Sequence, residues 1–464
     1  MKMVSRGVAE SSPSLLAQEG WAFRAEESAV RKAINTAIAP SERGVMWKPL
    51  SDGHPLSTEE TFKLLFDAHA SAIRGLVLAF SHDDYLTNVG GVQNCIGDEQ
   101  VSLQVEGWAY VHFCPNAPKP SLAVESSLSQ FCCIANVDGK RAGLVLMSDV
   151  LSAARKLGKS GAELRCIVHH LMGYSPEHLA LVAQACGSHT KPFVWIHDLF
   201  SLCPTFTLLR NEATFCHAPA LTSPACGVCH AGPDRSEHVR RVRNFFDATQ
   251  PIVLAPSQTI LDFWSSHHGY QRTDAHVVPP CSIEFHCDAP TYLPQRPLKV
   301  AFLGAPMYHK GWHVFEALAR WHATDARYEF YHLGRHDVQV PGIRFIQTGV
   351  SAKDRSAMLR SVTEANIDAV INWSLCFESF SFVTHEALAA GTYVIARKDA
   401  GHVAPVLSTQ YAESGLLVGS EIELNALFAD GEIRKLVSTS HRRFGTLHYG
   451  RGTTPVLTQE TGCA

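Results

Sequence analysis

Short, continuous apolar runs recur along this chain, separated in several places by stretches with a helical pattern. The first half contains GLVLAF (75–80), YVHFC (110–114), GLVLMS (143–148), LRCIVHH (164–170), PFVWIHD (192–198) and IVLAPS (252–257). Amphipathic stretches such as SPEHLALVAQACG lie between several of these runs. Strands that are apolar at every position are buried on both faces, which is typical of parallel sheets covered by helices. The pattern therefore predicts an α/β domain built on a parallel sheet.

A second series of the same kind follows the Pro-containing stretch HVVPPC (276–281), which we interpret as a domain linker. Its runs are LKVAFLGA (298–305), YEFYHLG (328–334), IRFIQTG (343–349), AVINWS (369–374) and TYVIARKD (392–399). We expect two Rossmann-like, doubly wound domains, residues 73–278 and 279–430, facing a cleft formed by loops at the carboxyl ends of their strands. Residues 431–464 fit either a terminal helix or a loose tail.

The first 72 residues are predicted to form a helical extension. EESAVRKAINTAIA has apolar residues at a spacing near 3.6. STEETFKLLFDAHASAI opens with Ser57, and Glu60 follows three residues later, which is the pattern of a capping box. The sequence leaves open whether this extension packs, oligomerises or holds an acceptor.

Composition excludes some classes of protein. The chain has 464 residues, 46% of them hydrophobic and 18% charged, which is typical of a globular protein. Its formal net charge of −4, without a basic patch, gives no reason to expect a nucleic-acid partner. The N-terminus lacks the apolar core of a signal peptide, and no run approaches the roughly 18 apolar residues of a membrane span. We expect a cytoplasmic protein with at most peripheral association at the inner face of the membrane.

Three strand-to-helix junctions have residues suited to phosphate and sugar chemistry. Gly90-Gly91 precedes an expected helix, where backbone N–H groups could approach an anion, although such a pair can also be an ordinary turn. Lys310-Gly311 opens another helix, where the ammonium could neutralise a diphosphate or simply be solvated. In the third, ESFSFVTHE, Ser379 or Ser381 could cap the helix that carries Glu386 and ends at Gly391.

The two glutamates of this third junction, Glu378 and Glu386, lie eight positions apart. Two carboxylates at this spacing can be a solvated helix surface, but here apolar residues flank them. We expect Glu378 in the loop at the strand end and Glu386 further along the helix. Free N–H groups around Ser381 and Phe382 would face the same cleft.

Taken together, these motifs resemble those of retaining glycosyltransferases of the family 4 type, which have the GT-B fold. The matching pieces, in order, are GGVQ (90–93), HD (197–198), APS (255–257), GxxxxxKG (304–311) and E-x7-E followed by ALAAG (378–391). The resemblance covers roughly residues 75 to 430. It implies transfer of a hexosyl group from a nucleotide sugar to a glycan or lipid-linked glycan, in bacterial surface polysaccharide synthesis.

The resemblance also implies a role for each matching residue. Lys310 would bind the donor diphosphate, and Gly90 and Gly91 would bring N–H groups to it from the other domain. Glu386 would accept hydrogen bonds from the ribose. Glu378, Ser381 and Phe382 would contact the donor sugar or diphosphate, with His197 beside the transferred sugar and Asp198 next to it. Lys310, Glu378 and His197 are thus the expected catalytic residues.

These roles need no catalytic metal, because a lysine and backbone N–H groups can stabilise the departing diphosphate. One departure from the family pattern is Ala305, where an arginine often assists the lysine. Arg335 and Arg397 are candidates for the missing charge; otherwise the donor site is weakened or altered.

Two further features lie near the HD motif. His169 and His170 end the run LRCIVHH; one could contact a sugar while the other is structural, and we rank His170 first, on the acceptor side with Asp198. Cys203, Cys216, Cys226 and Cys229 lie in one loop-rich stretch, 203–230, that ends in C-x2-C. They fit a structural zinc site, with His217 or His230 as substitutes, or else unliganded thiols or disulfides. A subset of the family has a similar Cys-rich loop, which favours zinc.

Other functions remain open from sequence alone. Another GT-B activity, such as a phosphorylase or a sugar-nucleotide epimerase, could use the same fold. So could a non-catalytic scaffold that binds sugar nucleotides, and Ala305 is the feature that points to it. The donor base, sugar, acceptor and linkage are not encoded in any of these motifs.

Overall fold

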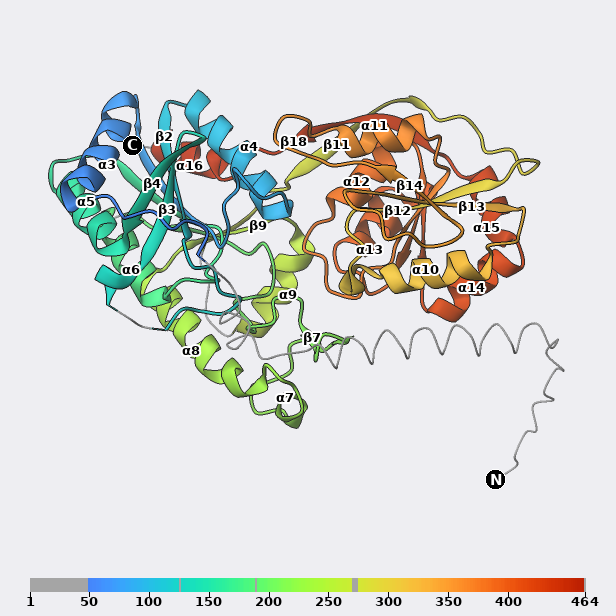
Figure 1. The fold of residues 1–464 in the computed structure, drawn as a ribbon, viewed down its shortest axis with the longest axis horizontal. Coiled ribbons are helices and arrows are strands. Elements are labelled where there is room, and N and C mark those ends of the chain that lie inside the picture. The colour runs from blue at the N-terminus through green and yellow to red at the C-terminus, as the bar shows by residue number, and fades with distance from the viewer. Residues whose placement is uncertain (1–48, 125–126, 188–189, 269–273, 463–464) are drawn as a thin grey trace.

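The computed structural model describes residues 49–124, 127–187, 190–268 and 274–462, and it contains two α/β lobes (Figure 1). The expected helix EESAVRKAINTAIA lies outside the described residues. The expected capping box is confirmed: Ser57 caps α3 (Thr58–Ser71), and Glu60 completes the box. Helix α3 packs on α5 (Met147–Lys159) of the first lobe.

The first lobe contains a mixed sheet of eight strands in the order β10-β9-β6-β5-β1-β2-β3-β4. Its strands are β1 (Gly75–Phe80), β2 (Trp108–Pro115), β3 (Cys132–Val137), β4 (Lys140–Leu146), β5 (Leu164–Val168), β6 (Phe193–Trp195), β9 (Ile252–Ala255) and β10 (Ala275–Val277). Its other helices are α4 (Gly91–Val105), α6 (Pro176–Ala185), α7 (Pro224–Gly227), α8 (Gly232–Thr249) and α9 (Gln258–His268).

Strand β1 shows why these apolar runs are continuous. Leu76, Leu78 and Phe80 share a core with residues of α3, α5, α6, α8 and α9. Val77 and Ala79 belong to a different core with residues of α4 and of the C-terminal helix α16 (Thr454–Gly462). Because both faces of the strand are covered, every position excludes water and the run is apolar throughout.

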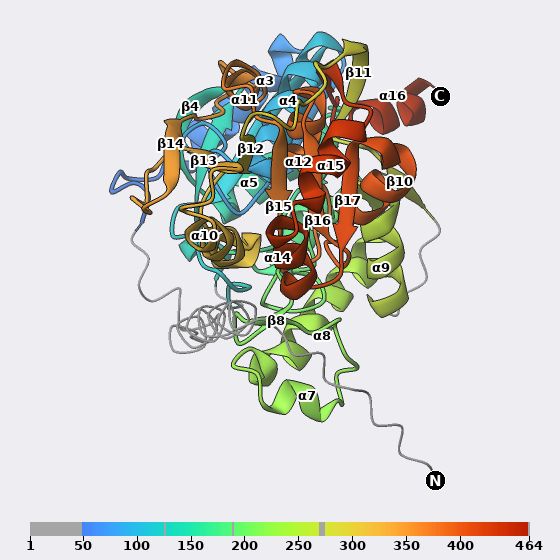
Figure 2. The same cartoon turned by 90° about the vertical axis from the view of Figure 1, so that its right-hand side faces the viewer.

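The second lobe contains a six-stranded sheet in the order β14-β13-β12-β15-β16-β17, and every pair in it is parallel. Its strands are β12 (Leu298–Leu303), β13 (Tyr328–Gly334), β14 (Ile343–Gln347), β15 (Ala369–Asn372), β16 (Tyr393–Arg397) and β17 (Gly415–Val418). Its helices are α10 (Trp312–Trp321), α11 (Ala357–Glu364), α12 (Phe382–Ala389), α13 (Val403–Pro405), α14 (Glu421–Ala429) and α15 (Glu432–Thr439). Figure 2 shows β15, β16 and β17 side by side. The prediction of two Rossmann-like domains is confirmed.

The first sheet differs from the expectation at one edge. Strand β3 was not expected, and the predicted strand 143–148 is instead β4, followed at Met147 by α5. The two strands form an antiparallel hairpin whose turn residues Asp138 and Gly139 have φ of 48° and 80°. An Asp-Gly pair with both φ positive is the usual two-residue hairpin turn, so the dipeptide was the available signal.

The C-terminal part of the chain is ordered and returns to the first lobe. Strand β18 (Arg443–Tyr449) pairs antiparallel with β11 (Cys281–Asp288), and α16 then packs against α4. Figure 1 shows this red helix among the blue and teal elements of the first lobe. The described residues contain no helix long and apolar enough to cross a membrane.

Candidate active site

The motifs meet where the two lobes face each other, at the carboxyl ends of their central strands. The loop after β1 leads to Gly90-Gly91, and β5 and β6 end at the His169-His170 and His197-Asp198 pairs. In the second lobe, β12 leads to Lys310 and β15 leads to Glu378. Ligands of open α/β sheets bind at this edge because the loops there converge.

Lys310 and Glu378 form an ion pair, with 2.7 Å between Nζ and Oε1. Burial alone would lower the pKa of Lys310, but the Glu378 carboxylate outweighs this effect and raises it. The next residue, Gly311, has a φ of 77°, and a Cβ there would lie 2.0 Å from the Trp373 carbonyl oxygen. Only glycine allows this close approach, which brings the loops after β12 and β15 together.

Helix α12 begins where the sequence predicted. Ser381 is its N-cap and accepts a hydrogen bond from the Thr384 N–H at 3.2 Å. Asn372, at the end of β15, donates to the hydroxyl oxygens of Ser381 and Thr384. The helix ends before Gly391, whose φ is 71°. The buried network ties the start of α12 to its strand.

Glu386 lies on the same helix and is 5% exposed. Burial raises the pKa of its carboxyl group to about 7, and the Arg355 charge only partly offsets this effect. It is therefore not a solvated surface charge. Glu378 is also buried, so the expectation that these carboxylates differ from an ordinary polar helix face is consistent with the structure.

Ser379 joins the E-x7-E loop to the first lobe. Its hydroxyl donates to the His197 carbonyl oxygen, and its own carbonyl oxygen accepts from the Ser257 hydroxyl at 2.7 Å. The HD and APS motifs are thereby held against the loop that carries Glu378. Nearby, the Phe377 ring packs on Phe263, with 4.5 Å between ring centroids.

The N-terminus of α4 faces the start of α12. A Cβ at Gly91 would lie 3.9 Å from the Phe382 ring, so the Gly90-Gly91 turn and the Phe382 side chain are neighbours across the lobes. Positive partial charge and backbone donors gather at a helix N-terminus. The structure thus brings the predicted phosphate-binding turn close to the predicted sugar-binding loop.

The histidine pairs are held by contacts within the first lobe, and the acceptor-side role of His170 and Asp198 stays a prediction. His170 accepts from the Met172 N–H at Nδ1, so its Nε2 carries the proton donated to Asp198 Oδ2, at 2.9 Å. Asp198 also accepts from the Phe200 N–H. Both ring nitrogens of His170 are occupied, which assigns it to holding Asp198 and the loop after β6.

His169, which we ranked below His170, contacts His197 directly. Its Nδ1 lies 3.0 Å from His197 Nε2, and its Nε2 lies 2.9 Å from Glu99 Oε1. His197 lines a small hollow with His170, Asp198 and Phe200. Sequence reasoning missed Glu99, since a single glutamate within helix α4 gave no signal. It also missed His82, whose ring lies 4.6 Å from that of His170.

The cations proposed to replace an arginine at Ala305 are engaged elsewhere. Arg335 donates to the Val350 carbonyl oxygen, and Arg397 lies 3.7 Å from Asp399. Arg355 is an additional cation at the junction between the lobes. It pairs with Asp98 of α4 at 3.0 Å, and its Nε and Nη1 atoms are buried without a hydrogen-bond partner in the described structure.

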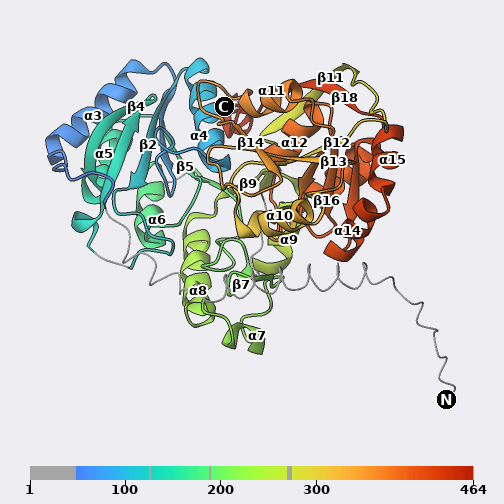
Figure 3. The ribbon, with the colours of Figure 1, turned by 45° about the vertical axis from the view of Figure 1, so that its right-hand side comes forward.

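The Cys-rich segment (203–230) includes α7 and leads into α8, and both helices project from the first lobe (Figure 3). The thirteen described cysteines all carry free thiols. The thiols of Cys203, Cys216 and Cys229 are neighbours of one another, and Arg235 is a neighbour of Cys203 and Cys216. Arg235 donates to Cys226 Sγ at 2.9 Å. Tetrahedral zinc holds sulfur atoms roughly 3.8 Å apart; here no three of these thiols lie within 4.8 Å of one another. Zinc binding would therefore require the thiols to move closer, and it stays a prediction.

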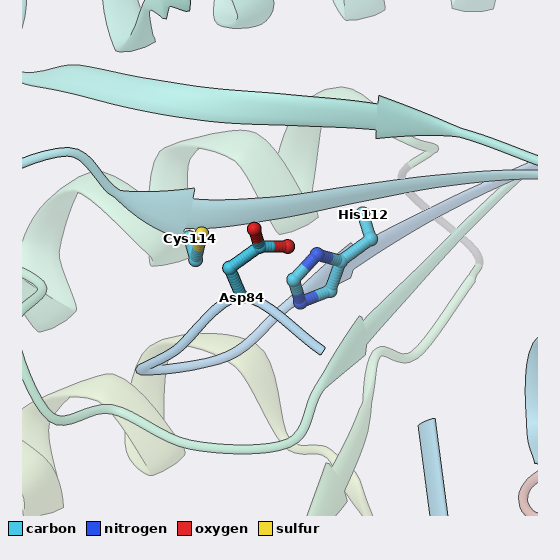
Figure 4. A group of neighbouring side chains, drawn as sticks. All are labelled: Asp84, His112 and Cys114. Carbon is cyan, nitrogen blue, oxygen red and sulfur yellow. The ribbon is translucent and has the colours of Figure 1, made fainter. Parts of the chain in front are cut away.

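Among the described residues, one group of potential ligands is closer together: Asp84, His112 and Cys114 (Figure 4). Asp84 already accepts from the side chains of Asn136 and Arg141, and His112 Nε2 is bonded to the Ser81 hydroxyl. Burial lowers the pKa of His112 to about 3. A cation here would meet two hydrogen-bond donors aimed at the carboxylate, so this cluster is an internal polar network that holds the loop after β1.

No protein-family model matches this chain, and neither does any curated protein. The fold is similar to that of sucrose-phosphate synthase from Thermosynechococcus elongatus, with 14% identity, a TM-score of 0.48 and coverage of 84% of this chain and 98% of that one. It is also similar to Anabaena HepE in complex with UDP and glucose, with 13% identity, a TM-score of 0.48 and coverage of 84% and 100%. A third similar structure is the lipopolysaccharide outer core galactosyltransferase WaaB, with 14% identity, a TM-score of 0.48 and coverage of 78% and 93%. Because these TM-scores are below 0.5, the function has to be argued from the side chains at the junction of the lobes.

Proposed function

We propose that this protein is a retaining glycosyltransferase that moves a hexosyl group from a nucleotide sugar to a hydroxyl of a glycan or lipid-linked glycan. The observation that carries the proposal is the Lys310–Glu378 pair, 2.7 Å apart, at the carboxyl ends of two adjacent parallel strands. An ammonium held there can neutralise the charge that develops on a departing diphosphate. A carboxylate beside it can bind the hydroxyls of the sugar that leaves.

The surrounding residues fit the same reaction. The N-terminus of α4, at Gly90 and Gly91, would supply backbone donors to the diphosphate from the other lobe. Glu386 would accept hydrogen bonds from the ribose, and the amides near Ser381 and Phe382 would meet the sugar or diphosphate. His197 would lie beside the transferred sugar. These donors and the ammonium would stabilise the negative charge that develops on the leaving group.

Nucleotide release from UDP-, GDP- and dTDP-sugars tests the proposal. We expect one donor to be turned over, and Lys310→Ala to lower kcat/KM by roughly 10²- to 10³-fold, the usual cost of removing a group that stabilises transition-state charge. Glu378→Ala should have a comparable effect. Lys435→Ala is the matched control, because its side chain is 73% exposed and lies far along the chain on α15; its kcat/KM should not change.

Other results would favour the alternatives. Phosphate-dependent release of a sugar phosphate would indicate a phosphorylase, and interconversion of two sugar nucleotides an epimerase. Calorimetric binding of a nucleotide sugar without turnover would indicate a non-catalytic scaffold. If no donor binds or reacts, the proposed function is wrong. We further propose that the acceptor belongs to a bacterial surface polysaccharide, which incubation with lipid-linked glycans would test.

A further inference from the structure

A buried chain of hydrogen bonds leads from His197, which is 8% exposed, into the first lobe. It passes from His197 to His169 and from His169 to Glu99, with contacts of 3.0 and 2.9 Å. The side chains of His169 and Glu99 are both 0% exposed. Buried polar groups are costly unless every donor and acceptor is matched, so the positions of the protons in this chain can be assigned from its contacts.

Glu99 is the acceptor end of the chain. Its Oε1 accepts from the Tyr110 hydroxyl and from His169, while its Oε2 accepts from the Thr453 N–H at 2.7 Å and from the Thr453 hydroxyl at 2.5 Å. Three of these four contacts come from the Tyr110 hydroxyl and from the N–H and hydroxyl of Thr453, all of them donors, and hydrogen bonds of this kind favour the charged form of a carboxyl group. The carboxylate is ionised and accepts four hydrogen bonds.

The proton positions on His169 and His197 follow from the ionised state of Glu99. His169 must donate from Nε2 to the carboxylate, so in its neutral form its Nδ1 has the lone pair. His197 must then donate from Nε2 to His169 Nδ1, and its own Nδ1 is left with a lone pair. The His197 ring is also stacked on Trp195, with 4.8 Å between centroids and an interplanar angle of 2°.

We propose that Glu99 and His169 are positioning residues that fix His197 as the tautomer with its proton on Nε2 and its lone pair on Nδ1. His197 then offers a hydrogen-bond acceptor to a hydroxyl group of a bound ligand. That the hydroxyl belongs to the transferred sugar rests on the proposed function; the tautomer does not.

Thr453, in the C-terminal segment, determines which of the two terminal side-chain atoms at position 99 must accept hydrogen bonds. The Thr453 backbone N–H can only donate, and the Thr453 hydroxyl also accepts from Trp195 Nε1 at 2.9 Å, so it donates to Glu99. In a Glu99→Gln variant, the amide oxygen must therefore face Thr453. The amide NH2 then faces His169 and donates to its Nε2. Each hydrogen bond in the chain then runs in the opposite direction. His169 donates from Nδ1 to His197 Nε2, and His197 has its own proton on Nδ1.

The tautomer can be measured directly from the imidazole ¹⁵N shifts of histidine-labelled protein, with the His197 signal assigned by its loss in a His197→Gln variant. In the wild type we expect protonated Nε2 and unprotonated Nδ1. Glu99→Gln should invert this pattern, whereas Thr453→Val, which keeps both the carboxylate and the Thr453-position N–H, should not. A wild-type His197 with its proton on Nδ1 would overturn the proposal even if Glu99→Gln failed to fold. So would a folded Glu99→Gln variant with the wild-type pattern.

Activity separates this inference from the proposed function. With a sugar nucleotide that the wild type uses, Glu99→Gln should lower kcat/KM roughly 10- to 100-fold. In the variant, the N–H at His197 Nδ1 would face a sugar hydroxyl that also donates a hydrogen bond, and two opposed hydrogen-bond donors usually have a cost of this size. If the wild type turns over no donor but shows the expected tautomer, the proposed function fails and the positioning role stands. If the variant inverts the tautomer without any change in kcat/KM, His197 does not accept from the sugar.

Discussion

Glu386 is a carboxyl group held away from water on the first helix after β15. Its Arg355 neighbour does not compensate for the loss of hydration, so burial raises its pKa to about 7. A ribose with two hydroxyl donors would supply the hydrogen bonds that water no longer provides. A buried carboxyl group of this kind lowers the stability of the ligand-free protein, and a ligand that supplies the hydrogen bonds would recover that stability. This trade-off is common in binding sites.

This pKa predicts how stability depends on pH. Between about pH 4.5 and 7 the folded protein keeps a proton on Glu386 that the unfolded chain has lost, so the contribution to stability falls as pH rises. The difference between the pKa of about 7 in the folded protein and 4.5 in the unfolded chain corresponds to about 3 kcal/mol above pH 7. Glu386→Gln should therefore be more stable than the wild type at pH 8.5 and nearly equal at pH 4.5, as measured by urea unfolding. Glu432→Gln, on the surface of α15, is the control. A Glu386→Gln variant that is equally destabilised at both values would contradict the prediction.

At the level of elements, the loop after β15 and helix α12 act as one unit. The Ser381 hydroxyl caps the helix and also accepts from Asn372, so it connects strand, loop and helix. The cap fixes where the helix begins. It therefore also fixes the distance between Glu378, which precedes the cap, and Glu386, which follows it. Donor binding should therefore depend on the Ser381 hydroxyl, even where only the backbone amides near Ser381 meet the donor.

Ser381→Ala tests this dependence. Loss of an N-cap costs about 1 kcal/mol, and the Asn372 amide would also lose an acceptor. We expect lower stability together with at least a severalfold weaker donor affinity, measured by calorimetry. Ser420→Ala removes a similar cap, at the start of α14, where Ser420 accepts from the Glu423 N–H. It should lower stability without changing donor affinity, and equal loss of affinity in both variants would refute the coupling.

The Cys-rich segment is a predicted zinc site. We predict one zinc ion per chain, held by Cys203, Cys216, Cys226 and Cys229 after the thiols move closer together. Metal analysis of the purified protein should show zinc in the wild type and none in a Cys226→Ser/Cys229→Ser double variant. Cys287→Ser, an exposed cysteine on β11, is the control. Full retention of metal in the double variant would exclude this site.

Across the whole molecule, the C-terminal segment joins the two lobes. Strand β18 completes a ribbon with β11, and the chain then reaches α4 at Glu99 before α16 covers β1 and β6. Gly452 makes this path possible: its φ is 55°, and a Cβ there would lie 2.5 Å from Glu99 Cβ. The same helix α4 thus carries the predicted phosphate-binding turn at one end and the anchor of the C-terminal segment near its middle.

Gly452→Ala should disrupt that anchor. Positive φ costs a non-glycine residue about 1–2 kcal/mol, and the overlap with Glu99 adds to it. Gly161→Ala isolates the first cost, because Gly161 has a φ of 83° and nothing within 4 Å of its Cβ position. We expect the thermal midpoint of Gly452→Ala to fall further than that of Gly161→Ala. We also expect only Gly452→Ala to lose activity. Equal decreases of the thermal midpoint in the two variants would show that the contact between position 452 and Glu99 is not tight.

The sequence by itself determined the parallel strands of both sheets, since strands buried on both faces must be apolar at every position. It also determined the strand-end positions of Lys310, Glu378, His197 and Gly90-Gly91, because parallel strands present their loops at a common edge. The Ser57 cap followed from local hydrogen bonding alone, whereas the cap of α12 was narrowed only to Ser379 or Ser381. The hairpin of β3 and β4 could also have been predicted, from its Asp-Gly turn.

Only the tertiary structure decided which of these groups touch. Glu99, His169 and Thr453 are up to 354 positions apart in the sequence, and no local pattern relates them. His169 and His170 are adjacent in the sequence, yet one faces the buried Glu99 carboxylate and the other the Met172 N–H and Asp198. Such assignments depend on long-range packing, which sets the direction of each side chain and the partner it meets.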